Sequence, residues 1–102
     1  MGVLDSRFIG LSYGQDTVTT AGSAEALNGG TSLTISTGTR LLIQGLSSNT
    51  DLVYVGDSGV SSSNGYELSA GQVVSLAIDD VATVYIDAAV NGEGVSWVVE
   101  VT

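Results

Sequence analysis

The sequence contains no cysteine, histidine, lysine or proline. Without cysteine the chain forms neither a disulfide framework nor a thiolate metal site. Without histidine it lacks the usual general base and the commonest metal ligand. Without lysine it also lacks a Ser–Lys catalytic pair, because a serine hydroxyl needs an adjacent base to become nucleophilic. These absences predict a protein that is not an enzyme, with no catalytic residue, no cofactor and no bound metal.

Positive charge is almost as scarce. Arg7 and Arg40 are the only strong cations against eleven carboxylates, so the net charge is −9. Nucleic-acid binding depends on neutralising phosphates with Lys and Arg, and attraction to an anionic membrane depends on the same residues. No apolar run approaches the roughly 20 residues that span a bilayer, and the N-terminus does not resemble a signal peptide. We therefore expect neither a nucleic-acid nor a membrane partner.

The 102 residues are enough for one domain with one modest core. Short β-branched runs alternate with Gly, Ser and Asn clusters about every ten residues, which is typical of an all-β sandwich or barrel. We predict a single antiparallel β-sandwich or jelly-roll-like domain of seven or eight strands over residues 17–102. The expected strands are 31–37, 39–46, 51–56, 66–68, 71–79, 82–88 and 95–102, with a weaker strand pair or a broken strand over 17–27.

The last two of these segments show the clearest pattern. One face of the final strand is apolar and consists of Val95, Trp97, Val99 and Val101. The other face consists of Ser96, Val98, Glu100 and Thr102, of which only Val98 is apolar. The link 91–94 reads Asn-Gly-Glu-Gly, a sequence typical of tight turns. The pattern predicts an antiparallel hairpin over residues 81–102, with Trp97 in the core.

Residues 1–16 have no clear period and are expected to form an N-terminal arm. Phe8, Ile9, Leu11 and Tyr13 lie within a glycine-punctuated stretch of this segment. Because a small domain cannot bury all its apolar residues, we predict that these four side chains dock on a neighbouring subunit or other partner. The alternative is that this segment is a first strand of the same domain.

The stretch Gly56–Val60 reads Gly-Asp-Ser-Gly-Val and resembles the surroundings of the nucleophilic serine in trypsin-like proteases. In that family a histidine takes the serine proton, and this chain has none. Ser58 is therefore predicted to be part of a loop between two strands.

Two further groups of residues have a structural and a functional interpretation. Asp79 and Asp80 are expected to cap a turn between strands, although with loop carbonyls they are also candidates for a Ca²⁺ site. Tyr54, Tyr66 and Tyr85 are candidates for an exposed aromatic patch that binds carbohydrate.

Residues 52–99 carry a recognisable succession of motifs. The first motif is a strand and loop that reads Val-Tyr-Val-Gly-Asp-Ser-Gly-Val-Ser, and a turn at 68–71 follows it. Next come a strand that ends in Asp79 and Asp80, a strand that contains Tyr-Ile-Asp, and a closing strand after Asn-Gly. This succession resembles small β-rich virion structural proteins of tailed bacteriophages. Such proteins are found as capsid decoration (cement) proteins or as β domains of head and tail fibres.

The resemblance implies a building block present in many copies, made in the host cytoplasm and located on the outer capsid surface of the virion. The implied partners are further copies of the chain, in a homo-oligomer that is expected to be a trimer, and the major capsid protein. The alternative function is a head or tail fibre domain, or a carbohydrate-binding β module, that mediates host attachment.

Overall fold

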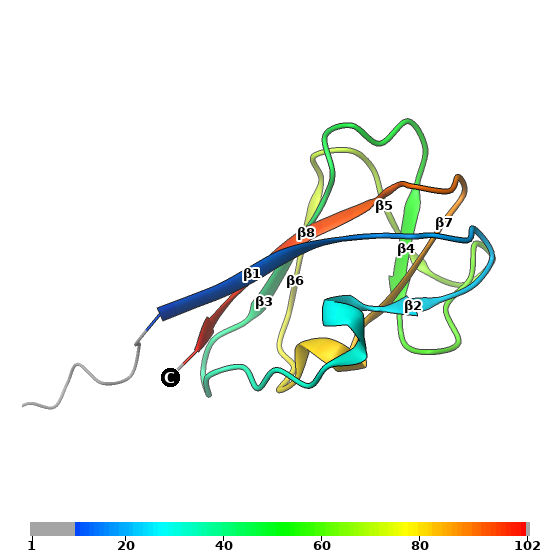
Figure 1. The fold of residues 1–102 in the computed structure, drawn as a ribbon. Coiled ribbons are helices and arrows are strands. Elements are labelled where there is room, and N and C mark those ends of the chain that lie inside the picture. Colours follow the sequence, from blue (N-terminus) through cyan, green and yellow to red (C-terminus); the bar gives the residue numbers. More distant parts are fainter. Residues whose placement is uncertain (1–9, 102) are drawn as a thin grey trace, which may run out of the picture.

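Apolar side chains at alternate positions build two β-sheets that pack face to face (Figure 1). The structure, a computed structural model, describes residues 10–101. Within them eight strands form two four-stranded antiparallel sheets, which confirms the predicted all-β sandwich. Sheet A has the strand order β1-β8-β3-β6 and sheet B the order β2-β7-β4-β5. The strands are β1 (Gly10–Thr17), β2 (Glu25–Ala26), β3 (Leu41–Gly45), β4 (Val53–Gly56), β5 (Tyr66–Leu68), β6 (Val73–Leu76), β7 (Tyr85–Ala88) and β8 (Gly94–Val101).

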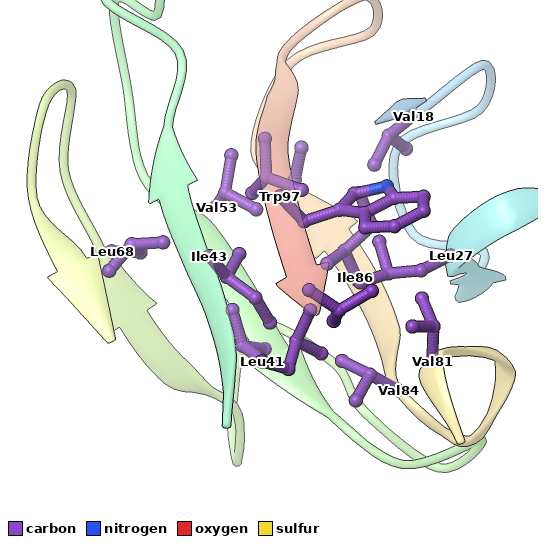
Figure 2. Packing of buried hydrophobic residues seen from close by; sticks show 14 of the residues in the cluster. Val18, Leu27, Leu41, Ile43, Val53, Leu68, Val81, Val84, Ile86 and Trp97 are labelled. Carbon is purple, nitrogen blue, oxygen red and sulfur yellow. The ribbon is translucent and has the colours of Figure 1, made fainter. Parts of the chain in front are cut away.

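The core lies between the sheets and is closed at one end by two short 3-10 helices, η2 (Leu27–Gly30) and η3 (Val81–Thr83). Figure 2 shows Trp97 packed in this core among aliphatic side chains from both sheets. Trp97 is 4% exposed, which confirms its predicted inward position. The fully buried aliphatic residues of the same core are Val18, Leu27, Leu41, Ile43, Val53, Leu68, Val81, Ile86 and Val95.

Trp97 imposes two requirements on the neighbouring strand β1. Its indole lies against Gly14, its direct cross-strand partner, where a Cβ atom would approach the Trp97 Cζ2 atom to 2.9 Å. Its indole Nε1 donates a hydrogen bond of 2.7 Å to the Asp16 Oδ2 atom. A buried indole N–H usually has such a partner, because an unpaired one costs free energy. Gly14 and Asp16 therefore fix the inward face of β1.

The predicted arm ends earlier than residue 16. Residues 10–17 form β1, and all eight pair with β8, from Gly10 opposite Val101 to Thr17 opposite Gly94. Figure 1 shows the two strands side by side. The prediction that residues 10–16 belong to the arm was wrong. The sequence shows no apolar alternation there, because the inward positions of β1 are Gly, Ser and Asp instead of large apolar residues. Residues 1–9 lie outside the described part of the chain.

The predicted hairpin over 81–102 is also wrong, although its turn and the face of β8 are correct. β7 belongs to sheet B and β8 to sheet A, so the link between them crosses from one sheet to the other. Gly92 has the expected positive φ of 88°, but its N–H donates to the Val18 carbonyl. Both strands bury one apolar face, and placing them in opposite sheets turns these faces toward each other across the core.

Two other expected strands are shorter or absent. Residues 31–37 form one isolated β-bridge, between Thr34 and Asp80. Of residues 17–27, Thr17 ends β1 and Glu25–Ala26 form β2, and the others lie in no strand. Asp80 has the capping role predicted for it: its carboxylate accepts hydrogen bonds from the Ala82 N–H (2.9 Å), the Leu33 N–H (3.0 Å) and the Ser32 hydroxyl. Together with the backbone bonds from the Ile35 N–H to the Asp79 carbonyl and from the Val81 N–H to the Leu33 carbonyl, the Asp80 carboxylate holds this segment against the start of η3.

Glu93 connects the crossing between the sheets to the loop that precedes β4. Its carboxylate accepts hydrogen bonds of 2.6 Å from both the hydroxyl and the N–H of Thr50, and one of 3.1 Å from the Asp51 N–H. The Thr50 hydroxyl, assisted by these two N–H groups, holds the pKa of Glu93 below its ordinary value, while desolvation opposes the shift.

We expect Asp16→Ala to destabilise the fold by about 1–3 kcal/mol, because it leaves the buried Trp97 N–H without an acceptor. Urea unfolding followed by tryptophan fluorescence measures the change. Gln15→Ala, at the adjacent exposed position of β1, is the control and should stay within about 0.5 kcal/mol of the wild type. Equal stability of the two variants would contradict the role given to Asp16.

Glu93 should make stability depend on pH in the acidic range. Since its pKa is lowered in the folded state, its contribution is complete above the unfolded value of about 4.3 and is lost as the pH falls through and below it. We therefore expect Glu93→Gln to flatten the decline of the melting temperature below about pH 4.3. Glu67→Gln, at an exposed position of β5, is the control. An identical decline in wild type and Glu93→Gln would refute this.

Candidate functional site

Large apolar side chains gather on the outer face of sheet A, the face turned away from the core. Among residues 10–101, six large apolar residues are exposed: Leu11, Tyr13, Leu42, Tyr66, Val73 and Val90. Four of them, from strands β1, β3 and β6, lie on this one face: Leu11, Tyr13, Leu42 and Val73. Isolated exposed apolar residues need no explanation, but a contiguous group is a candidate contact surface.

The register of the strands brings these residues into contact distance of one another. Tyr13 is the direct partner of Val98, which is in turn the direct partner of Leu42. Directly opposite residues in antiparallel strands have Cβ atoms about 4.5–5.5 Å apart. Tyr13, Val98 and Leu42 therefore form a continuous apolar row across three strands, with Leu11 two residues before Tyr13 on the same face of β1. We call Leu11, Tyr13, Leu42, Val73 and Val98 the outer apolar face.

Two shallow hollows lie on this face. One, of about 460 Å³, is lined by residues of all four strands and the approach to β3, including Leu11, Arg40, Ser75 and Glu100. The other, of about 300 Å³, lies on the side of Gln44, Val73 and Ser96. Leu42 and Val98 line both hollows and stand between them. The surface thus has a central apolar ridge with a depression on each side.

The ridge has a charged group of each sign beside it. Arg40 donates hydrogen bonds to Ser75, from Nε to Oγ at 2.6 Å and from Nη2 to the carbonyl at 3.2 Å, so its guanidinium lies across the outer surface of β6. Glu100, on β8, is exposed on the same face. Both residues line the larger hollow.

The structure brings together two of the four residues predicted to bind a partner. Leu11 and Tyr13 are 56% and 75% exposed on the outer apolar face. Phe8 and Ile9 lie outside the described residues. The prediction missed Leu42, Val73 and Val98. For Val98 and Leu42 the sequence contained a signal, a break in the alternation of apolar and polar residues. Val98 was the exception on the polar face of its strand, and Leu42 lies between the inward residues Leu41 and Ile43. An apolar residue at a polar position indicates a second apolar face.

The Gly-Asp-Ser-Gly stretch lies in the loop between β4 and β5, as predicted. The Asp57 carboxylate accepts a hydrogen bond from the Gly59 N–H (2.9 Å). The Asn64 side chain accepts one from the Ser61 N–H through Oδ1 (2.8 Å) and donates one from Nδ2 to the Gly59 carbonyl (3.1 Å). Gly65 in this loop is required by close packing, since a Cβ atom there would lie 2.6 Å from the Tyr54 Cβ atom. The loop therefore covers Tyr54.

The three tyrosines of the alternative carbohydrate site do not form a patch. Tyr54 is buried beneath the loop that contains Gly65, at 7% exposure. Tyr66 is opposite Val55, one position along β4 from Tyr54, and therefore lies on the other face of sheet B. There it borders an apolar slot of about 470 Å³ between the two sheets, lined also by Val74 and Ile78.

Acidic residues are scattered over the described part of the chain. Within residues 10–101 no group of three or more His, Cys, Asp or Glu side chains is arranged to hold a metal ion. The Ser32 hydroxyl and the N–H groups of Leu33 and Ala82 lower the pKa of Asp80. Asp80 is thus an ionised capping group. No helix formed by the described residues has the length and apolarity needed to cross a bilayer.

Comparison with known proteins finds no family model that matches this chain, no curated protein and no solved structure. The resemblance to phage virion proteins remains a prediction from the motifs of residues 52–99.

The opposite orientations of Leu42 and Ile43 can be tested by truncating each. Ile43→Ala should cost about 2–5 kcal/mol, because Ile43 is fully buried in the core. Leu42→Ala should cost less than about 1 kcal/mol, because its side chain is 44% exposed on the outer apolar face. Urea unfolding of both variants provides the measurement, and similar losses would mean that the two faces of β3 are wrongly assigned.

Proposed function

We propose that this chain is a non-enzymatic virion structural protein, a capsid decoration (cement) protein that binds the outer capsid surface and stabilises the head. Its partners are further copies of itself, in a trimer, and the major capsid protein. The observation that carries the proposal is the outer apolar face: four of the six exposed large apolar residues between residues 10 and 101 gather on one sheet of a small sandwich. Such a surface suits a protein whose working state is a complex.

The composition supports a contact with protein in preference to one with nucleic acid or membrane. A net charge of −9 repels polyanions, including the DNA packaged inside a head. The strands of sheet A carry no lysine or arginine, and their outward residues include the exposed Gln15, Thr17 and Gln44 and the partly exposed Ser75 and Ser96. Polar but uncharged groups of this kind are less costly to desolvate at a contact than long charged side chains.

Multiplicity supplies the stabilisation in this proposal. A single contact through a face of this size is weak, but a decoration protein repeats it at many equivalent positions of a lattice. Once a few copies are placed, each further contact of a connected shell forms at high effective concentration. The shell then resists internal pressure without any strong individual bond.

The alternative is a fibre domain that binds carbohydrate. The burial of Tyr54 removes one of its three candidate residues, and Tyr66 lies on a different face from Tyr85 and Tyr54. Exposed Tyr66 beside the apolar slot between the sheets is the feature that favours this alternative. A tyrosine ring at the border of a hollow is a surface on which a sugar ring can stack.

Binding to capsids tests the proposal directly. Purified protein should co-sediment in saturable amounts with heads of its own phage from which the endogenous copies have been stripped. Tyr13→Ser should reduce binding at least 10-fold, since it removes the most exposed member of the outer apolar face. Val90→Ser is the control and should bind like the wild type, because Val90 is exposed in the link from β7 to β8, away from the outer apolar face.

The same experiment separates the two functions. Absence of co-sedimentation at any protein concentration would overturn the decoration proposal. Saturable binding to a glycan panel that is lost in Tyr66→Ser would establish the alternative in its place.

A further inference from the structure

The distribution of charge on sheet A bears on the identity of the partner. The four strands of this sheet contain only two carboxylates, Asp16 and Glu100. Asp16 is directed toward the core side, where it bonds Trp97. Glu100 is therefore the one carboxylate that these strands present on the outer apolar face, and Arg40 balances it from the same hollow. A chain with a net charge of −9 thus has one face that is locally neutral.

This neutrality matters most for contacts between identical molecules. Two copies of an acidic protein repel each other, and the repulsion falls when the surfaces that meet carry no net charge. A strongly basic partner would meet only Glu100 on this face, and would leave Arg40 facing like charge. A second copy supplies both signs at once, because each copy offers Arg40 and Glu100.

The relief of the face is complementary to itself in the same way. The ridge of Leu42 and Val98 lies between two hollows. A second copy that faces the first, displaced by the distance from the ridge to a hollow, therefore places its ridge in that hollow. In a symmetric oligomer each surface element meets its complement on the neighbour. Charge and shape both fit a further copy of the same chain.

We propose that the outer apolar face of sheet A is the surface through which copies of this chain associate, with Arg40 of one copy facing Glu100 of the next. The proposal rests on the proposed function and deepens it, since it names the partner of the contact surface. Tyr13→Ser then weakens binding to heads because a dissociated copy loses the multivalency of the oligomer.

Matched lysine substitutions test the apolar part. Leu42 and Val90 are both 44% exposed, but Leu42 is on the outer apolar face and Val90 is in the link between the sheets. We expect light scattering behind a sizing column to give an oligomer for the wild type and Val90→Lys. Leu42→Lys should be monomeric, or associate at least 10-fold more weakly. Circular dichroism and thermal unfolding verify that each variant is folded.

A charge exchange tests whether the partner is the same chain. Arg40→Glu and Glu100→Arg should each weaken association, because each places like charges on the locally neutral face. The double variant Arg40→Glu/Glu100→Arg restores opposite charges across a contact between two copies, so it should recover association. A double variant that associates no better than the single ones would overturn the pairing of Arg40 with Glu100.

The outcomes separate this inference from the proposed function. A wild-type chain that remains monomeric at millimolar concentration, or a Leu42→Lys variant with unchanged mass, would overturn the self-association surface. Such a chain can still bind stripped heads, and then the decoration function stands. An oligomer that depends on Leu42 but binds no head supports the surface and contradicts the decoration function.

Discussion

The burial of Trp97 is the constraint on which the arrangement of sheet A depends. The indole ring requires an opposing residue without a side chain, which Gly14 provides, and its N–H requires an acceptor, which Asp16 provides. Both lie on β1, so they determine its register on β8. Because successive side chains of a strand point to opposite faces, a slip of one residue would turn Tyr13 inward. The interior of the molecule thus decides which side chains of β1 reach the surface.

Strand β8 links the core to the candidate contact surface. It pairs with β1 on one edge and β3 on the other, and it buries Val95, Trp97 and Val99 against sheet B. Its opposite face holds Val98 at the centre of the apolar row. Val98 is the one apolar residue on that face of β8, but it joins Tyr13 and Leu42 in a row that crosses three strands, and such a row is normally covered by a partner. In this sandwich sheet B covers one face, and the other is the surface for which a partner is proposed.

The sequence predicted the fold class, the inward face of β8 and the capping role of Asp80, because these depend on local alternation and turn chemistry. It did not predict that β7 and β8 belong to different sheets, since Asn-Gly turn chemistry is the same whether the chain returns in one sheet or crosses to the other. It did not reveal β1, because the inward residues Gly14 and Asp16 contact Trp97, which lies more than eighty residues away in the sequence. Three of the five residues of the outer apolar face, Leu42, Val73 and Val98, were also missed, because strands distant in sequence bring them to one face.

The pairing of β1 with β8 also has a consequence for the way the chain folds. The hydrogen bonds of sheet A join residues 10–17 to residues 94–101, so the contacts that stabilise it are among the most distant in sequence. Long-range pairing of this kind is slow, because the entropy of closing a long loop must be overcome before the contacts form. During synthesis β1 and β3 emerge from the ribosome long before β8, the strand that pairs with both. Sheet A can therefore be completed only after β8 has left the ribosome, and until then β1 and β3 lack the strand that joins them.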